Sequence, residues 1–451
     1  MTTPYRGGFA PASEEITAFD LEVTGRIPAE LDGRYLRNGP NPLNLDDPNA
    51  GHLFTGEGMV HGVRLRDGRA EWYRNRWVRN AAVSEHLGER PRPGPVHAGM
   101  DLAANTHVIG LAGRTLATVE AGGLPYELGY ELDTIGACDF DGGLPGGFAA
   151  HTHLDPFSGE LHAVAYHFGW DHHQHIVIDP KGVVSQVKNI PIADKPMLHD
   201  FALTERYVVI YDLPVTFSMA HAEQGRLPYA WNDAHGSRLG LMSRESGDIR
   251  WVEVEPCWVF HTLNAYDDGD EVVVDVVRYP KRFVDARLDL GGTPKLDRWR
   301  IDPRSGKVGR TRLDDRAQEF PRMDERRAGR PYRYGYTSAT HDLLDVVYPA
   351  DTELEDLPDE AFDNTLIKHD LERGTQESRN FGRGAYVGEP VFVGSGAGED
   401  DGYVLSYVND PARGAADLMI LSAQDFTGEP VATVHLPARV PLGFHGSWIA
   451  D

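Results

Sequence analysis

The chain has 451 residues, of which 41% are hydrophobic, and a chain of this size can bury a large core. Its 69 acidic residues outnumber its 44 basic ones, and the formal net charge of -25 argues against nucleic acid or an anionic membrane surface as an electrostatic partner. An uncharged ligand fits this balance better.

Short strand-like runs separated by turn residues follow one another along the chain. They are rich in β-branched and aromatic residues and are bounded by Gly, Asp, Asn or Pro, as strands joined by tight turns should be. The clearest runs are residues 60–65, 107–111, 115–119, 175–179, 207–213, 271–279, 403–408 and 417–423. Helical periodicity is hard to find, and the 49 glycines and 30 prolines are spread over the whole length. The pattern predicts one all-β domain over residues 1–451.

The spacing of these runs is typical of a β-propeller. Recurring four-strand groups of about 40 to 60 residues are what propeller blades require, and seven such blades fit this length. Two less regular segments, 213–244 and 315–336, are each too long for a hairpin turn. We expect these two segments to form a dome over one face of the propeller.

The two cysteines and the N-terminal segment bear on the compartment. Cys138 and Cys257 lack CxxC spacing, so neither a disulfide framework nor a thiolate metal site is expected, and a reducing cytoplasm is the natural location. The N-terminal segment has no apolar signal region, and no run of about 18 apolar residues could span a bilayer. Export and integral membrane insertion are therefore not expected.

Four of the 20 histidines differ from the others in their surroundings, because each lies in or beside an apolar or aromatic run. They are His151 in GGFAAHTHLDP, His199 in MLHDFALT, His261 in CWVFHTLNAY and His445 in VPLGFHGSW. Successive members are separated by 48, 62 and 184 residues, close to one, one and several blade lengths. A ring of blades could therefore direct all four toward a common axis.

These motifs resemble the carotenoid cleavage oxygenase family. The resemblance begins with LDGRYLRNGPNP at 31–42 and HLFTGEGMVHGVRL at 52–65, and continues through LATVEAGGLPYEL at 116–128. It includes all four histidine contexts and EPVFV at 389–393, in the family's order and over nearly the whole chain. It implies a seven-bladed propeller with a dome of helices and loops, one Fe(II) on the axis, and cleavage of a conjugated C=C bond by O2 to give carbonyl products.

The same resemblance assigns the metal ligands. It implies that the four histidines hold Fe(II) and that Glu120, Glu319 and Glu389 accept hydrogen bonds from three of them, leaving His151 without a carboxylate partner. Neutral imidazoles suit ferrous iron, whereas structural zinc usually recruits cysteine. Carboxylates that accept the other ring N–H fix the tautomer, and they offset the charge of a metal whose four ligands are neutral.

A long apolar substrate requires a tunnel lined by aromatic and aliphatic side chains. The candidate lining residues are Phe54, Phe217, Tyr229, Trp231, Phe260, Phe444 and Trp448. The segment from Leu213 to Trp231 is the candidate apolar patch for peripheral contact with a membrane that holds a lipophilic substrate. No obligate protein partner is indicated.

The residue before Glu120 bears on the choice of substrate. Family members that cleave hydroxylated stilbenes resemble this segment but carry lysine where this chain has Val119, and that lysine meets the phenol. A carotenoid or apocarotenoid is therefore the first prediction, and a stilbenoid of the lignostilbene type is the alternative.

Other interpretations stay open. The tract HFGWDHHQH, residues 167–175, could be a zinc site, although a solvated loop is the simpler interpretation. His153 is a reserve ligand candidate two residues from His151. The propeller could also be a binding scaffold without catalysis, or the iron could support a non-redox isomerohydrolase reaction on a retinoid ester.

Overall fold

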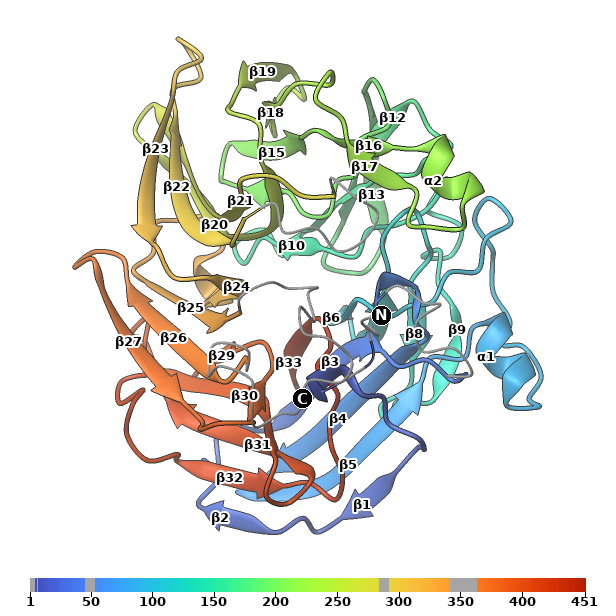
Figure 1. Cartoon of the computed structure of the whole chain (residues 1–451), viewed down its shortest axis with the longest axis vertical. Coiled ribbons are helices and arrows are strands. Elements are labelled where there is room, and N and C mark those ends of the chain that lie inside the picture. Colours follow the sequence, from blue (N-terminus) through green and yellow to red (C-terminus); the bar gives the residue numbers. More distant parts are fainter. Residues whose placement is uncertain (1–4, 6, 45–52, 284–291, 341–362) are drawn as a thin grey trace.

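The computed structural model describes residues 5, 7–44, 53–283, 292–340 and 363–451. Among these residues, seven sheets of four or more strands are arranged in a ring around a central axis (Figure 1), which confirms the predicted seven-bladed β-propeller. We number the sheets blade 1 to blade 7 in ring order. A separate two-stranded sheet, β16–β17, lies outside the blades.

Blades 2 to 6 are each formed by one continuous stretch of chain. The strands of each blade are given below in the order in which they pair within the sheet. Blade 2 contains β6 (His107–Leu111), β7 (Arg114–Thr118), β8 (Tyr126–Leu128) and β9 (Thr134–Ala137). Blade 3 contains β10 (Thr152–Leu154), β11 (Leu161–Ala165), β12 (His172–Ile178) and β13 (Val184–Pro191). Blade 4 contains β14 (Ala202–Leu203), β15 (Tyr207–Asp212), β18 (Arg238–Ser243) and β19 (Ile249–Glu253).

Blades 5 and 6 follow the same order. Blade 5 contains β20 (Trp258–Asp268), β21 (Glu271–Tyr279), β22 (Lys295–Ile301) and β23 (Val308–Asp314). Blade 6 contains β24 (Gln318–Met323), β25 (Tyr334–Ala339), β26 (Thr365–Asp370) and β27 (Thr375–Asn380).

Blades 1 and 7 combine strands from both ends of the chain, which closes the ring. Blade 1 contains β1 (Thr17–Phe19), β5 (Arg69–Trp77), β4 (Gly58–Arg66), β3 (Gly33–Pro40) and the C-terminal β33 (Gly446–Ala450). Blade 7 contains β2 (Val23–Gly25), β32 (Ala432–His435), β31 (Ala415–Ser422), β30 (Gly402–Asp410), β28 (Tyr386–Val387) and β29 (Val391–Gly394). The outer edges of these two blades are the short strands β1 and β2, in keeping with the short edges of propeller blades.

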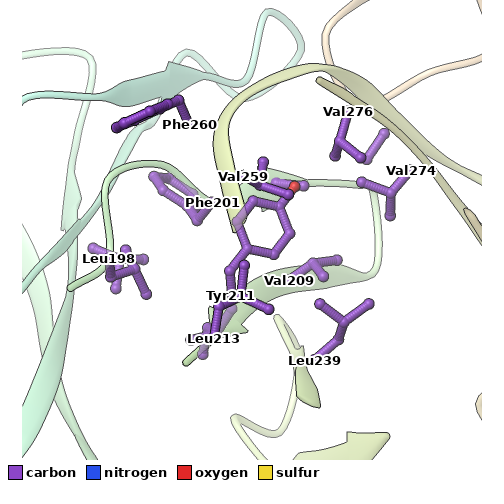
Figure 2. Packing of buried hydrophobic residues seen from close by; sticks show 14 of the residues in the cluster. Leu198, Phe201, Val209, Tyr211, Leu213, Leu239, Val259, Phe260, Val274 and Val276 are labelled. Carbon is purple, nitrogen blue, oxygen red and sulfur yellow. The ribbon is translucent and has the colours of Figure 1, made fainter. Parts of the chain in front are cut away.

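The core lies between neighbouring blades. Strand β21 is buried along almost its whole length because its blade is covered on both faces, so its sequence EVVVDVVRY is apolar on both sides. Figure 2 shows how side chains of blade 4, such as Val209 and Tyr211, pack against Val259 and Val274 of blade 5. This packing holds the innermost strands in place around the axis.

The prediction that residues 315–336 form a dome insertion is largely wrong. Residues 315–336 contain β24, the short 3-10 helix η3 (Glu325–Arg327) and the start of β25, which are regular parts of blade 6. A register shift between Glu319 and Arg322 interrupts the alternation of side chains along β24. Because this segment also contains many charged residues, its sequence does not resemble that of a strand. Residues 213–244 hold the β16 (Val215–Phe217) and β17 (Tyr229–Trp231) hairpin with α2 (Met219–Glu223), but β18 already begins at Arg238.

Helices are few and short among the described residues. They are α1 (Ala81–His86), α2, η1 (Gly7–Phe9), η2 (Leu53–Thr55) and η3. Within the part of the chain that the structure describes, no helix has the length and apolar character needed to cross a membrane.

Candidate metal centre

The four histidines singled out in the sequence stand at the starts of innermost strands. His151 directly precedes β10, His199 comes three residues before β14, His261 lies near the start of β20, and His445 directly precedes β33. These strands belong to four different blades that surround the same axis (Figure 1). Positions that are distant in sequence are therefore neighbours in space.

The side chains of these histidines converge on one point. One nitrogen from each ring lies within 4.8 Å of the others. Nε2 of His199 is 3.1 Å from Nε2 of His151 and 3.2 Å from Nε2 of His261. Adjacent nitrogens that each lie about 2.1 Å from one metal ion are about 3 Å apart, so the arrangement fits a single bound ion. No other group of three or more potential ligands of this kind occurs among the described residues.

Three carboxylates, two of them buried, lie behind three of the four rings. Nδ1 of His261 donates to Oε2 of Glu319 at 2.6 Å, and Nδ1 of His445 donates to Oε1 of Glu389 at 2.8 Å. Nδ1 of His199 lies 2.8 Å from Oε1 of Glu120. A ring that carries its proton on Nδ1 presents an unprotonated Nε2 to the centre, which is the form that binds a metal.

The three carboxylates pair with His199, His261 and His445, and no ion pair with His151 occurs among the described residues. Glu319 is completely buried even though it lies in a segment rich in charged residues. The bulge in β24 that turns Glu319 inward is not visible in the residue pattern.

Each carboxylate is held in turn by an outer partner that the sequence did not reveal. Oη of Tyr166 donates to Glu120 at 2.6 Å, and Oη of Tyr279 donates to Glu319 at 2.9 Å. Nη1 of Arg322 donates to Glu389 at 3.0 Å. The only available signal was that Tyr279 ends a strand-like run, which does not specify a direction. Arg322 lies in the segment 315–336, for which the sequence predicted no strand.

Burial and mutual proximity favour the neutral form of two of the four rings, His151 and His445. Burial and the neighbouring histidines hold the pKa of His151 and of His445 well below the ordinary value. Burial would also lower the pKa of His261, but the carboxylate of Glu319 outweighs it and raises that pKa. Neutral imidazoles with free lone pairs are the form that a first-row transition metal requires.

An aromatic wall borders the four rings. Phe54 lies with its ring 6.2 Å from that of His199 and 5.7 Å from that of Phe444, and Phe260 lies 5.0 Å from His199. Phe320 was missed in the sequence, although it stacks on His261 at 5.6 Å. It has a left-handed backbone, with φ of 53°, at the bulge that also directs Glu319 inward.

Two other tunnel candidates, Phe217 and Tyr229, belong to the β16–β17 hairpin, where their rings pack in an edge-to-face arrangement with centres 6.3 Å apart. Tyr229 is buried and lies 5.9 Å from Tyr166, the partner of Glu120. Trp231 is half-buried in the same hairpin, and its Nε1 donates to Asp233.

The prediction for Trp448 is wrong. This residue pairs with Tyr35 across β33 and β3 and packs into the core of blades 1 and 7, away from the aromatic wall. Side chains alternate along a strand, so a position three residues after His445 need not share its direction.

The tract from His167 to His175 is a loop only in its first part, because β12 begins at His172. His172 begins β12, His173 bonds the carbonyl of Pro196 at 3.1 Å, and His175 pairs with His162 at 3.1 Å. Each histidine thus has its own partner, and the tract forms no metal cluster. His153 likewise pairs with Asp200 at 2.8 Å instead of joining the four converging rings.

We expect the His162–His175 pair to weaken the fold at acidic pH. Burial lowers the pKa of His162 to about 3 and that of His175 to about 4. The unfolded chain takes up these protons near pH 6.5, so stability falls as the pH drops from about 6.5 toward 4, by about 3 kcal/mol for His175. Denaturant titrations at pH 7 and pH 4.5 should show a smaller loss in His175→Gln than in the unsubstituted protein. An equal loss in both would contradict the expectation.

Comparison with known proteins agrees with this geometry. The model of the family described as "RPE65: Retinal pigment epithelial membrane protein" matches residues 9–450. A carotenoid cleavage oxygenase of Mycobacterium tuberculosis is 46% identical, over 99% of this chain and 97% of that protein. A carotenoid 9,10(9',10')-cleavage dioxygenase 1 of Phaseolus vulgaris is 31% identical, over 99% of this chain and 89% of that protein.

Solved structures of similar proteins have the same architecture. The cobalt-substituted apocarotenoid oxygenase of Synechocystis aligns with a TM-score of 0.85 and 27% identity, over 99% of this chain and 98% of that one. The lignostilbene dioxygenase of Pseudomonas brassicacearum aligns with a TM-score of 0.88 and 28% identity, over 100% of this chain and 99% of that one. The chain belongs to the RPE65 and carotenoid cleavage oxygenase family, and it is an oxygenase of that family.

Proposed function

We propose that this protein binds one Fe(II) through Nε2 of His151, His199, His261 and His445, and uses O2 to cleave a conjugated C=C bond of a carotenoid or apocarotenoid. The observation that carries the proposal is the convergence of four buried imidazoles, three of them backed by carboxylates, on one point. A binding scaffold without catalysis gives no reason for such a costly buried cluster.

The residues fit iron in their chemistry as well as in their spacing. All four donors are imidazoles without a thiolate, a set that suits ferrous iron. When bound, the ion would supply activation of dioxygen toward the double bond. A cobalt-substituted structure of a relative supports a transition metal as the cofactor.

The chain itself orients the reactants and excludes water. Glu319 and Glu389 hold His261 and His445 in one tautomer, so the direction of each Nε2 lone pair is fixed before the metal arrives. Phe54, Phe260 and Phe444 form an apolar wall beside His199, against which a rigid polyene can lie. Exclusion of water from the site protects reactive species from side reactions with solvent.

The named relatives support a carotenoid-type substrate. The 46% identical protein is a carotenoid cleavage oxygenase, and the Phaseolus relative cleaves carotenoids. Val119 is buried beside Glu120 and offers no cation or hydrogen bond to a phenol. The lignostilbene dioxygenase aligns at a slightly higher TM-score, which keeps a stilbenoid as the second candidate.

The proposal is tested by aerobic incubation of iron-loaded protein with an apocarotenal and, separately, with a hydroxystilbene. Chromatography of carbonyl products and an oxygen electrode provide the two measurements. We expect aldehydes from the apocarotenal with matching consumption of O2. Products from the stilbene alone would overturn the choice of substrate, and turnover of a retinoid ester without O2 consumption would indicate an isomerohydrolase instead.

We also propose a cytoplasmic location and peripheral contact with a membrane through the segment from Leu213 to Trp231. Both cysteines are free, which suits a reducing compartment. Met219 in α2 is 61% exposed and is the apolar side chain available to lipid, while the nearby Lys281 pairs with Asp233 at 3.2 Å beside the ring of Trp231. Loss of vesicle co-sedimentation in Met219→Glu would support this contact, and unchanged binding would contradict it.

A further inference from the structure

The three carboxylates behind the histidines differ in the charge of the side chains that hold them. Glu319 and Glu389 are almost completely buried, and the side chain of Glu120 is 12% exposed. Two of these carboxylates are held by neutral phenols, Glu120 by Tyr166 and Glu319 by Tyr279. Glu389 alone is held by a cation.

That cation is Arg322, on the bulged strand β24. Its Nη1 donates to Oε2 of Glu389 and to the carbonyl of Gly446, both at 3.0 Å, and its side chain is only 12% exposed. Gly446 follows His445 and donates its own N–H to Glu389 at 2.8 Å. Arg322 therefore contacts both the carboxylate partner and the adjoining backbone of one histidine.

The other charges near these groups are not bonded to the three glutamates. The buried Arg37 interacts with Glu389 only through space, and its guanidinium donates to the carbonyl of Pro441. Nη2 of Arg322 also contacts Glu325, but that carboxylate is 65% exposed and is screened by water. Asp200 has its own partner in His153 and accepts backbone N–H bonds from Phe201 and Thr262. Neither group is bonded to one of the three glutamates behind the rings.

The four imidazoles are neutral and contribute no charge. The charged groups that are hydrogen-bonded around the centre are then three carboxylates and one guanidinium. These sum to two negative charges, which a divalent ion neutralises and a trivalent ion exceeds by one. In a buried site with little water, an excess charge of either sign is costly. Without Arg322 the same site would match a trivalent ion.

We infer that Arg322 sets the charge of this centre to match a divalent ion and so favours Fe(II) over Fe(III). The inference rests on the proposed function, since it concerns the iron that the four histidines would hold. Arg322 would be a positioning and charge-setting residue that acts through Glu389 and does not touch the substrate. Its effect should therefore appear in the one-electron couple, in which Fe(II) loses an electron to an added oxidant and becomes Fe(III).

The test measures the midpoint of this couple in iron-loaded protein, by titration with ferricyanide and dithionite and by the electron paramagnetic resonance signal of Fe(III). In Arg322→Gln, we expect the equilibrium to shift at least tenfold toward Fe(III), which is 59 mV for one electron. Arg322→Lys, which keeps the charge, should stay within about threefold of the unsubstituted protein.

A second pair of variants distinguishes an effect of the charge of Arg322 from an effect of holding Glu389 in position. Glu389→Gln removes a negative charge and should shift the couple at least tenfold toward Fe(II), a test that stands even if Arg322→Gln fails to fold. The double variant Arg322→Gln with Glu389→Gln restores the charge sum and should return close to the original midpoint. A role limited to holding Glu389 in place would instead leave the double variant no better than the single ones, which would overturn the inference.

A matched control is Arg298→Gln, on β22. Arg298 also pairs with a buried carboxylate, Asp275 at 2.7 Å, but neither residue contacts the four histidines or their glutamates. Its midpoint should be unchanged. An unchanged midpoint in Arg322→Gln that still binds iron would overturn this inference alone, whereas absence of stoichiometric iron in the unsubstituted protein would overturn the proposed function itself.

Discussion

Replacing His261 by alanine is expected to abolish both iron retention and product formation. Its Nε2 lies 3.2 Å from that of His199, and its Nδ1 is fixed by Glu319, so the variant loses a donor that is already oriented. Changing an outer partner of a metal ligand typically costs about 10- to 100-fold in affinity or activity, and loss of the ligand itself should cost more than about 100-fold. Metal analysis after dialysis and product chromatography measure the two effects.

The control for this experiment is His172→Ala. His172 belongs to the histidine-rich tract but pairs with the exposed Asp171 at the start of β12. We expect full iron content and activity in this variant, since its ring takes no part in the converging cluster. Iron loss in His172→Ala together with retention in His261→Ala would contradict the assignment of the centre.

The second large effect is expected for Glu319→Ala. This carboxylate accepts hydrogen bonds from His261, from Oη of Tyr279 and from the backbone N–H of Phe320. Its removal frees the tautomer of His261 and leaves buried donors without an acceptor, so iron affinity should fall about 10- to 100-fold. Stability should fall by about 3 kcal/mol, because each buried unpaired donor costs about 1 to 3 kcal/mol.

Competition with a chelator measures the loss of iron affinity, and unfolding in urea measures the loss of stability. Glu319→Gln keeps an acceptor for His261 while removing the charge, so it should recover much of the stability but only part of the affinity. Glu372→Ala is the surface control, since this carboxylate is 74% exposed and should change stability by less than about 0.5 kcal/mol. Equal losses in Glu319→Ala and Glu372→Ala would contradict a role for Glu319 at the centre.

Local residue patterns were sufficient for the general architecture. Alternating β-branched runs with Gly and Asp turns predicted an all-β ring, and the structure has seven blades. That the whole chain is one domain stays an inference, supported by the pairing of β33 with β3. The expected insertion at 315–336 was wrong because β24 contains a bulge and many charges, which hide the alternation of a strand.

The four histidines could be selected from sequence because each lies in an apolar context that forces it inward, and the family motifs reinforced that choice. The same approach failed for Trp448, whose direction depends on its pairing with Tyr35 in β3. It also missed Phe320, because only the backbone reversal at the bulge brings this ring against His261.

The sequence by itself determined the fold class, the family and the residue types of the centre, since these depend on local composition and ordered motifs. Only the tertiary structure decided that Glu120 lies behind His199, Glu319 behind His261 and Glu389 behind His445, and that Arg322 binds the last of these carboxylates. The reason is that these partners come from different blades. Their contacts depend on strand register and on bulges, where a shift of one residue reverses the direction of every side chain.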